Sequence, residues 1–362
     1  MNVIITVFAL YIFIHLLLQA GLRKKPSLIK HKPAVTVLIA AKNEEILLPG
    51  LIESLLKLEY EKKLLEIIII NDRSADSTLN IAQEYARNYE HITVLNITNE
   101  IDGLSGKMNA LAQGIDRSKG ELILITDADC LVSPDWVKNY VSYFKPDVGI
   151  VGGLTVLDPV GFFSTIQMLD WLFLQAIAAG TAGIGLPVTI LGNNFSFRKK
   201  AYEEAGGFSK IGFSVTEDLA LLNAIKNNTS WKIRYFLMRE TAVESKAVPD
   251  LKAFYQQRKR WIIGGKRVSW WGYFLMSSAF AAHLLMLLMW PFNLTSTFTI
   301  ILLTMSLIAD FLLLYVIAVR IKRERLLRFF PFFEIFYIIY TLILAFLFVL
   351  PAKVRWKEQQ FK

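Results

Sequence analysis

Residues 120–136 read GELILITDADCLVSPDW, an apolar run that ends in two aspartates one residue apart. The run is short and continuously apolar, which is typical of a strand buried on both faces of a sheet. Asp127 and Asp129 therefore follow the point where this strand is expected to end. Two carboxylates so close together repel each other unless a positive group offsets their charge.

Short apolar runs alternate with amphipathic helical patterns from about residue 33 to residue 250. Strands are expected at AVTVLIAA (34–41), LEIIIIND (65–72), ITVLNIT (92–98) and ELILITDAD (121–129), with helices at 44–58, 78–89 and 106–118. This alternation predicts an α/β fold with a doubly wound, mostly parallel sheet. Ligands of such sheets bind at the carboxyl ends of the strands, so Asn71, Asp72 and the Asp127–Asp129 pair should converge there.

Long apolar stretches flank this region in a chain of 362 residues that is 54% apolar and carries a formal net charge of +9. Residues 3–22, 273–292, 297–319 and 330–351 are each long enough to cross about 30 Å of hydrocarbon as a helix. The first stretch lacks a basic region before it and a small-residue cleavage site after it. We therefore expect a retained anchor rather than a signal peptide.

Basic residues at 23–25 and 30–32 favour a cytoplasmic location for the domain that follows. RIKRERLLR at 320–328 is expected on the same side, so the two apolar stretches before it form a hairpin. The last stretch would then leave KVRWKEQQFK outside, against the same charge bias. This stretch can instead lie in the membrane interface or re-enter it, which leaves the number of spans open.

These features predict an integral membrane protein, in the inner or plasma membrane if the cell is bacterial, whose catalytic domain is cytoplasmic. It has four parts: an N-terminal transmembrane anchor (1–22), a cytoplasmic domain (33–250), an interfacial helix (251–272) and a C-terminal transmembrane region of about three helices (273–351). Residues 160–192 are apolar too, but their polar residues, glycines and proline argue against a further span. We expect an amphipathic segment that lies at the membrane.

The aspartate pair can hold one divalent cation together with phosphate oxygens of a ligand, and all-oxygen ligation suits Mg²⁺ or Mn²⁺. An acidic turn or helix cap is the alternative, because a lone DxD pattern is common by chance. Further motifs follow in a fixed order over residues 35–261: VTVLIAAKNEE, IIIINDRSADSTLNIA, GKMNAL, ILITDADC, LGNNFSFRKKAYEEAGGF, TEDLAL and QQRKRW. A single short pattern carries little weight, whereas this ordered set is highly specific.

Together these motifs resemble the inverting family 2 glycosyltransferases, which have the nucleotide-sugar-binding GT-A fold. The TED and QxxRW elements are similar to those of the membrane-embedded branch that contains cellulose and hyaluronan synthases and ceramide glucosyltransferase. The resemblance places Ala41, Asn43, Glu45 and Asp72 in the region that binds the nucleotide base and ribose. For Asp72, capping of the following helix is the structural alternative.

The resemblance also implies roles around the aspartate pair. Asp129 matches the direct metal ligand, and Asp127 matches a metal-binding residue that contacts the sugar or nucleotide. Lys107 follows Gly106 at an expected helix start, where a cation and backbone N–H groups can meet an anion. A solvated lysine is the alternative for Lys107. On this interpretation, a metal–diphosphate unit offsets the repulsion between the two carboxylates.

TEDLAL at 216–221 begins a helical pattern in which acids in the first turn are also expected from capping by Thr216. In the family's motif Asp218 is the general base that takes the proton of the acceptor hydroxyl, and Glu217 supports it. An inverting displacement needs such a base, because the nucleophile attacks one face of the sugar while the diphosphate leaves from the other.

Gln257, Arg260 and Trp261 have the QxxRW spacing, which places them on one face of a helix. The resemblance implies that Arg260 stabilises charge on the leaving diphosphate, that Gln257 shares its site, and that Trp261 stacks on the acceptor. A basic interfacial helix is the alternative. Asn193 and Asn194 match an acceptor-side loop, and ordinary turn asparagines are an equal alternative for them.

Other residues give weaker signals. No histidine has a partner at zinc-ligand spacing, so the sequence predicts no zinc site. His283, inside an expected span, is most simply a helix-packing residue with its hydrogen bonds satisfied. The single cysteine, Cys130, is expected to be a small core residue, because neighbouring Asp129 disfavours a thiolate. No nucleic-acid-binding module is visible, so a nucleic-acid partner is not expected.

The sequence thus predicts a membrane-bound, metal-dependent inverting glycosyltransferase. The expected donor is a nucleotide-diphosphate sugar, with a UDP-sugar preferred, and the expected partners are a lipid or glycan acceptor and membrane lipids. Transfer of one sugar to a lipid is preferred over a processive polysaccharide synthase, because about three C-terminal spans make a sparse wall for a polymer channel. A catalytically inactive nucleotide-binding scaffold is the second alternative.

Overall fold

The computed structural model describes residues 2–23, 32–289, 291–292, 294–349, 354–356 and 359–361. The chain forms two compact units. The helical unit comprises Met1–Lys24, Leu157–Val188 and Ala247–Lys362, and the sheet unit comprises Lys25–Val156 and Thr189–Lys246. Residues 24–25 and 30–31, which are parts of two expected basic segments, lie outside the described residues. The side chains of residues 353–362 lie outside them as well.

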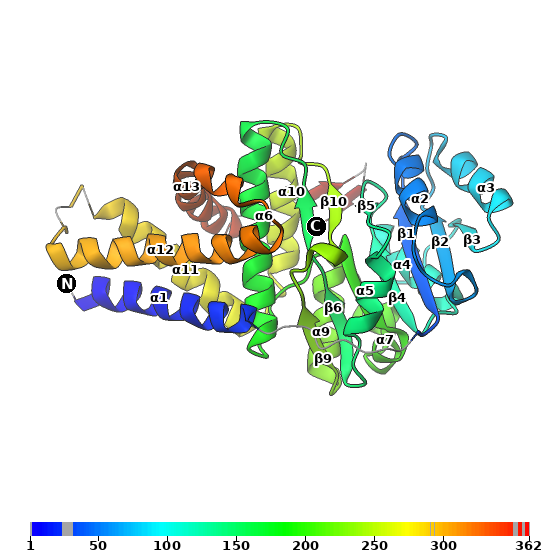
Figure 1. Ribbon diagram of the computed structural model, residues 1–362, viewed down its shortest axis with the longest axis horizontal. Helices are drawn as coiled ribbons and strands as arrows, with labels where there is room; N and C mark the ends of the chain where they lie inside the picture. The colour runs from blue at the N-terminus through cyan, green and yellow to red at the C-terminus, as the bar shows by residue number, and fades with distance from the viewer. Residues whose placement is uncertain are drawn as a thin grey trace. The chain divides into compact units, whose positions relative to one another are not determined.

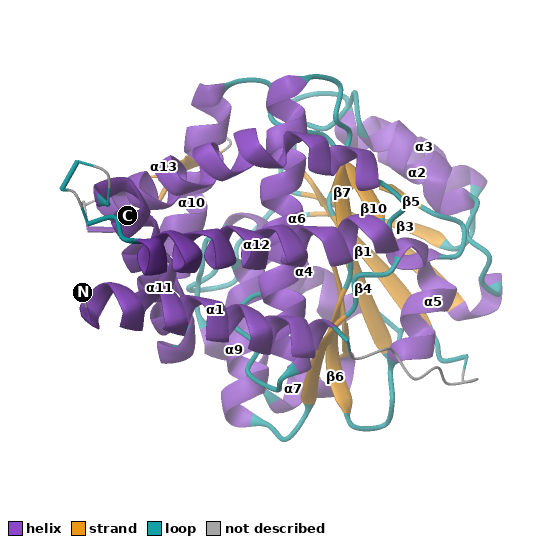
Figure 2. Cartoon of the chain, turned by 60° about the vertical axis from the view of Figure 1, so that its left-hand side comes forward, coloured by secondary structure: helices purple, strands orange, loops and turns teal. Residues whose placement is uncertain are grey.

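The sheet unit is built on a seven-stranded sheet in the order β3-β2-β1-β4-β8-β6-β9 (Figures 1 and 2). Its strands are β1 (Val35–Ala41), β2 (Leu65–Asn71), β3 (Ile92–Asn96), β4 (Leu122–Thr126), β6 (Val148–Gly152), β8 (Asn194–Arg198) and β9 (Lys232–Tyr235). The first four pair with one another in parallel, whereas β8 is antiparallel to both β4 and β6. The expected α/β fold with a mostly parallel sheet is confirmed.

Helices cover both faces of this sheet. They are α2 (Leu48–Leu56), α3 (Thr78–Asn88), α4 (Gly106–Arg117), α5 (Trp136–Tyr143), α7 (Lys199–Glu204), α8 (Gly207–Ile211) and α9 (Glu217–Asn228). Three short strands form a second sheet in the order β5 (Leu131–Val132), β10 (Val243–Ser245) and β7 (Thr155–Leu157). Two 3₁₀ helices span Lys62–Leu64 and Arg239–Thr241.

Side chains alternate across β1, which explains why the strand needs helices on both sides. Val37 and Ile39 are buried in the cluster that includes the apolar residues of α2 and α5. Leu38 points the other way, toward α4, where a Cβ on Gly114 would lie 2.4 Å from Cδ1 of Ile70. A side chain at position 114 would require Ile70 to move, so glycine here lets α4 pack closely on the sheet. Each fully buried aliphatic side chain contributes about 1.5–3 kcal/mol.

The helical unit contains the apolar segments expected from the sequence. Its helices are α1 (Asn2–Leu22), α6 (Phe162–Gly183), α10 (Leu251–Gly265), α11 (Trp270–Leu288), α12 (Thr297–Arg320) and α13 (Phe330–Val349). A 3₁₀ helix spans Glu324–Phe329, and β11 (Val354–Trp356) pairs with β12 (Gln359–Phe361). The segment 251–272, expected to be one interfacial helix, therefore contains the whole of α10 and the first three residues of α11.

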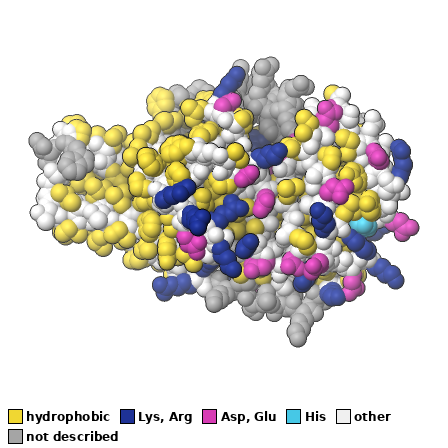
Figure 3. All heavy atoms as spheres, turned by 45° about the horizontal axis from the view of Figure 1, so that its top comes forward, with side chains coloured by type: hydrophobic (Ala, Val, Ile, Leu, Met, Phe, Trp, Pro, Cys, Tyr) yellow, Lys and Arg dark blue, Asp and Glu magenta, His cyan; other side chains and the backbone are white. Residues whose placement is uncertain are grey.

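Five helices of the described residues are long and apolar enough to cross a membrane: α1, α6, α11, α12 and the stretch Glu324–Phe348. Four of them match the spans expected from the sequence. The additional one is α6, which lies within the segment expected at the membrane surface. Figure 1 shows α6 running across α1 and α12 rather than alongside them. Hydrophobic side chains cover the exposed surface of α1, α11 and α12, at the left of Figure 3.

Glycines allow α6 and α1 to cross in close contact. A Cβ on Gly21 would lie 2.0 Å from the backbone oxygen of Gly180, and one on Gly183 would lie 2.2 Å from the oxygen of Gly21. Any side chain at these positions would force the helices apart. Small residues at such crossings are typical of helices that pack in a membrane.

Candidate active site

The ends of three parallel strands define the candidate site. Ala41 of β1 pairs with Asn71 of β2, and the amide of Asp72 donates to the oxygen of Ala41 at 2.8 Å. Asp127 and Asp129 directly follow β4, the other neighbour of β1. The prediction that these residues converge at the carboxyl edge of the sheet is confirmed.

Hydrogen bonds join the loop after β1 to the loop after β2. The side chains that form them belong to residues predicted to bind the nucleotide. Oδ1 of Asn43 accepts from the amide of Ala75 at 2.8 Å, and Oε2 of Glu45 accepts from the amide of Ser77 at 2.9 Å. Asn43 adopts the left-handed conformation, with φ 54°. Both residues are exposed, whereas Ala41 is buried, so these contacts shape the rim of the site.

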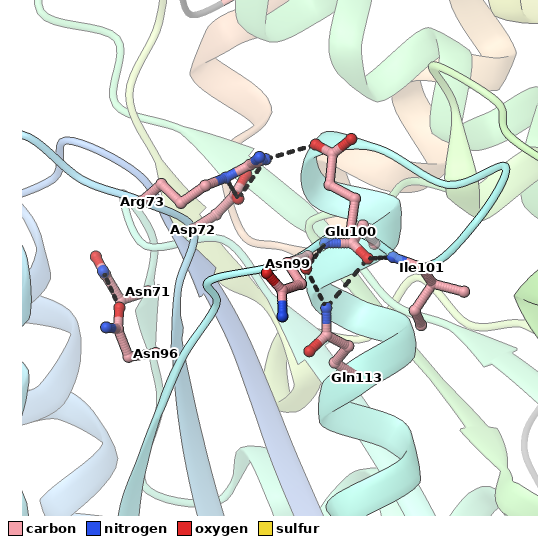
Figure 4. Close-up of polar contacts among 9 residues, drawn as sticks. Asn71, Asp72, Arg73, Asn96, Asn99, Glu100, Ile101 and Gln113 are labelled. Atoms are coloured by element: carbon pink, nitrogen blue, oxygen red, sulfur yellow. Dashed lines mark hydrogen bonds and ion pairs between the residues drawn. The ribbon is translucent and has the colours of Figure 1, made fainter.

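Asp72 is almost fully buried beneath an arginine (Figure 4). Nε of Arg73 donates to Oδ1 of Asp72 at 3.0 Å, and Nη2 of Arg73 donates to Oε1 of Glu100 at 2.7 Å. Beside them, Nδ2 of Asn71 donates to Oδ1 of Asn96 at 2.8 Å, whereas no described residue donates to the buried Oδ1 of Asn71. This unpaired oxygen is a buried acceptor at the ligand edge of the sheet.

Lys107 forms an ion pair with one member of the aspartate pair. Its Nζ lies 2.6 Å from Oδ1 of Asp127 and 2.7 Å from Oε1 of Glu217. Burial disfavours the charge on Lys107, but Asp127 and Glu217 outweigh it and raise the pKa of the ammonium well above its usual range. The lysine therefore stays charged and offsets Asp127, an ion pair that the sequence analysis did not foresee.

Asp129 lacks such a partner. Among the described residues no lysine or arginine forms an ion pair with it, and Oδ1 of Asp129 accepts a hydrogen bond from the weak donor Sγ of Cys130, at 3.4 Å. Burial, and then the charge of nearby Asp127, raise the pKa of Asp129. A half-buried carboxylate with unbalanced charge beside a second carboxylate fits a divalent cation with oxygen ligands.

Cys130 is buried in the core, as expected. Burial and the carboxylates of Asp129 and Asp127 raise the pKa of its thiol well above the usual range. A thiol in this state is a poor nucleophile, so cysteine chemistry at this position is disfavoured.

Glu217 and Asp218 open α9, with Thr216 at the N-cap position but without a side-chain cap hydrogen bond. Oδ1 of Asp218 accepts from the amide of Leu219 at 2.7 Å. Gly192 lies directly against both acids, because a Cβ there would be 3.0 Å from Oδ2 of Asp218 and 3.3 Å from Oε1 of Glu217. Gly192 was not among the predicted site residues, although it is the first residue of the GNN motif.

The two asparagines after Gly192 have different environments. Oδ1 of Asn193 accepts from Oγ1 of Thr155 at 3.0 Å, and Asn193 is partly exposed. Asn194 is 0% exposed. Its Oδ1 accepts from Trp136 and Tyr140, and its Nδ2 donates to two backbone oxygens, those of Leu154 and Thr241. The expectation that Asn194 contacts substrate is therefore wrong, because internal bonds use its whole amide group.

Gln257, Arg260 and Trp261 lie on α10 in the helical unit and are each partly exposed. The guanidinium of Arg258 forms a cation–π contact with one face of the Trp261 ring, with the guanidinium carbon 4.0 Å from the ring centroid. Arg258 itself is buried and forms an ion pair with Asp170 of α6. This pair was missed in the sequence, where Arg258 is one of the two variable positions of QxxRW.

The sequence profile described as "Glycosyltransferase like family 2" matches residues 33–264, well over half of the chain. The chain belongs to glycosyltransferase family 2. This membership agrees with the motifs quoted above and with the α/β fold.

Two relatives illustrate the range of the family. The chain is 32% identical over 243 residues to the beta-monoglucosyldiacylglycerol synthase of Trichormus variabilis, a match that covers 64% of this chain and 49% of the relative. It is 30% identical over 278 residues to the poly-beta-1,6-N-acetyl-D-glucosamine synthase of Staphylococcus aureus, covering 74% of this chain and 63% of the relative. The chain thus spans about half to two thirds of the length of these relatives.

A solved structure shares the fold. The mannosyltransferase PcManGT from Pyrobaculum calidifontis, in complex with GDP-Man and Mn²⁺, has a TM-score of 0.61 to this chain. It is 18% identical, and the match covers 95% of this chain and 93% of that one. At 18% identity the similarity shows that the two proteins share a GT-A-type fold. It does not identify the ligands of this chain.

Proposed function

We propose that the protein is a membrane-embedded inverting glycosyltransferase that moves a sugar from a nucleotide-diphosphate sugar to a lipid acceptor. The observation that carries this proposal is the cluster at the strand ends, where Lys107 joins Asp127 to Glu217 while Asp129 keeps an unbalanced carboxylate. All four catalytic-type aspartates, Asp72, Asp127, Asp129 and Asp218, are present, which speaks against an inactive scaffold.

Asp129 and Asp127 would hold the cation, either Mg²⁺ or Mn²⁺, with Asp129 as the direct ligand. The fit rests on the half-buried, unbalanced carboxylate of Asp129. When bound, such an ion neutralises charge on the donor's diphosphate. Lys107 fixes the orientation of Asp127, and the buried Asp72 with its partner Arg73 lines the nucleotide side of the site.

Asp218 is the proposed general base. It takes the proton of the acceptor hydroxyl, and the acceptor oxygen forms a bond to the anomeric carbon. The bond from that carbon to the diphosphate oxygen breaks, and its electron pair leaves with the nucleoside diphosphate, so the configuration inverts. The hydrogen bond from the Leu219 amide orients one carboxylate oxygen of Asp218. Lys107 holds Glu217 beside it.

Arg260, Gln257 and Trp261, on the helical unit, are assigned catalytic or binding roles from the resemblance alone. Arg260 would stabilise charge on the leaving diphosphate, as the resemblance implies for the QxxRW motif. The ion pair of Arg258 with Asp170 holds α10 against α6, and the contact of Arg258 with Trp261 fixes that ring. Arg258 is therefore a positioning residue for the motif rather than part of the reaction.

A single transfer to a lipid is preferred over polymer synthesis. The relatives include enzymes named for each outcome, so family membership alone does not decide. The described helices α11, α12 and α13 offer a sparse wall for a polymer channel. A UDP-sugar is the preferred donor, and the sheet unit is proposed to face the cytoplasm.

The test is incubation of membranes that contain the protein with a panel of labelled nucleotide sugars. Organic-soluble product is then separated from high-mass product. Label in the organic phase supports the lipid acceptor, and label in the high-mass fraction supports the polysaccharide alternative. Absence of transfer from every donor, with or without Mn²⁺, would favour the scaffold.

A further inference from the structure

Three ionisable side chains from three different helices meet inside the helical unit. They are His283 of α11, Asp310 of α12 and Glu334 of α13, and one ligand atom from each lies within 4.8 Å of the other two. His283 and Asp310 are 0% exposed and Glu334 is 5% exposed. Their positions, 283, 310 and 334, follow no local spacing, so no sequence motif predicts the cluster.

The polar atoms of this cluster lack partners. Within the part of the chain that the structure describes, no hydrogen-bond partner is present for either ring nitrogen of His283, for Oδ2 of Asp310 or for either carboxylate oxygen of Glu334 when both acids are ionised. The expectation that the hydrogen bonds of His283 are satisfied is therefore not met in full, because only the backbone of Ala279 is in reach of the ring. A buried polar group without a partner is costly, and several at one place indicate a ligand.

The other oxygen of Asp310 is firmly held. Tyr11 donates its hydroxyl to Oδ1 of Asp310 at 2.7 Å, and Nε2 of His15 lies 2.8 Å from the same atom. The second oxygen of Asp310, Oδ2, therefore remains available to a ligand in the cluster with His283 and Glu334. A carboxylate with one oxygen held by neighbours and the other open is the arrangement that supports metal ligands.

We propose that His283, Asp310 and Glu334 bind one divalent transition-metal ion of the zinc class. The mixed set of one imidazole nitrogen and two carboxylates suits this class. Two buried carboxylates repel each other, and either a cation or a shared proton must offset their charge. A proton shared between Glu334 and Asp310 would join the two acids but leave His283 with no polar contact except one to the backbone of Ala279, whereas a metal ion would engage all three side chains.

The ion would join α11, α12 and α13, with α1 contributing Tyr11 and His15 around it. Three protein ligands leave at least one coordination position for water. This site is separate from the Asp127–Asp129 pair, which belongs to the sheet unit, and the proposal does not depend on the proposed sugar transfer.

The test uses the full chain, expressed with added Zn²⁺ and purified in detergent without chelator, followed by elemental analysis. We expect about one Zn²⁺ per chain. His283→Gln and Glu334→Gln should each reduce the retained metal by about 10-fold or more. Ser306→Ala, a buried polar change one turn from Asp310 on α12, should keep the metal. So should Asp129→Asn, which separates this ion from one at the strand ends.

A second measurement needs no variant and so does not depend on the variants folding. The purified protein is stripped with chelator and titrated with Co²⁺, and visible absorption reports cobalt bound to nitrogen and oxygen ligands. Saturation near one equivalent supports the proposal. Folded wild-type protein that takes up neither Zn²⁺ nor Co²⁺ overturns it in favour of a shared proton. Equal metal retention in folded His283→Gln protein overturns it as well.

Discussion

Nζ of Lys107, at the start of α4, lies 2.7 Å from Oε1 of Glu217, the first residue of α9. The two residues are 110 positions apart in the sequence, and the same ammonium also pairs with Asp127. One buried cation therefore fixes the distance between the donor-side strand end and the helix that carries the proposed base.

Lys107→Met should destabilise the sheet unit and abolish transfer. The substitution leaves Asp127 and Glu217 without their cation, a loss that typically costs about 3 kcal/mol for a buried pair. Glu217 is 9% exposed and so receives little compensation from solvent, whereas Asp127 is 37% exposed and is partly compensated, which keeps the cost at the low end for buried pairs. We expect the melting temperature, measured by intrinsic fluorescence, to fall by about 6–12 °C. Lys107→Arg is the matched control and should lose less, and an unchanged melting temperature in Lys107→Met would contradict the role of this ion pair.

Asp129→Asn should have the opposite effect on stability. Because burial and Asp127 raise the pKa of Asp129 above its value in the unfolded chain, its ionised form is a penalty to folding at neutral pH. The amide removes this penalty, so the melting temperature without metal should rise. The gain should shrink as the pH falls through the raised pKa, since the wild-type carboxyl is then neutral too.

The same variant should no longer respond to metal. We expect Mn²⁺ with a nucleoside diphosphate to raise the melting temperature of the wild-type protein and to leave that of Asp129→Asn unchanged. A variant that keeps the Mn²⁺ response would show that Asp129 is not the ligand, and a variant less stable than wild type without metal would contradict the electrostatic penalty assigned to this carboxylate.

Gly192→Ala should lower turnover more than stability. The added Cβ would lie 3.0 Å from Oδ2 of Asp218, close enough to displace that carboxylate by a few tenths of an ångström. We expect kcat to fall while KM for the donor changes little, because the donor side of the site is not touched. Gly161→Ala is the matched control, since no atom lies within 4 Å of its Cβ. Equal kcat in both variants would remove Gly192 from the site.

Cys130 should report whether the sheet unit is folded. Since burial and two carboxylates raise the pKa of this single thiol, a thiol-reactive dye should label the native chain far more slowly than the denatured chain at mildly alkaline pH. Mass spectrometry of the intact protein measures the fraction labelled. Rapid labelling of the native protein would contradict the buried position of Cys130.

The arrangement of the strand ends near the site could be predicted from the sequence, because the strands there all run in the same direction. Continuous apolar runs predict β1, β2 and β4, and parallel pairing brings their carboxyl ends to one edge. The antiparallel strand β8 was not predicted, since its pairing with β4 and β6 depends on a return of the chain after α6. The role of Asn194 was mistaken for the same reason, because its partners lie on other elements.

Side-chain pairs that join distant elements could not be predicted. Lys107 and Glu217 were each singled out, but their ion pair depends on how α4 and α9 pack. The pairing of Arg258 with Asp170, and the meeting of His283 with two acids, likewise require the helices to be placed in space. Single-residue chemistry is readable from the sequence, whereas charge compensation is a property of the packed structure.

The most direct test is transfer of labelled sugar by purified protein that carries Asp218→Asn, assayed beside wild type with Mn²⁺, a nucleotide sugar and membrane lipid. The amide cannot accept the proton of the acceptor hydroxyl, so the rate should fall by about 100-fold or more while the melting temperature stays close to that of wild type. Full turnover in a folded Asp218→Asn protein would contradict the assignment of the base and with it the proposed mechanism.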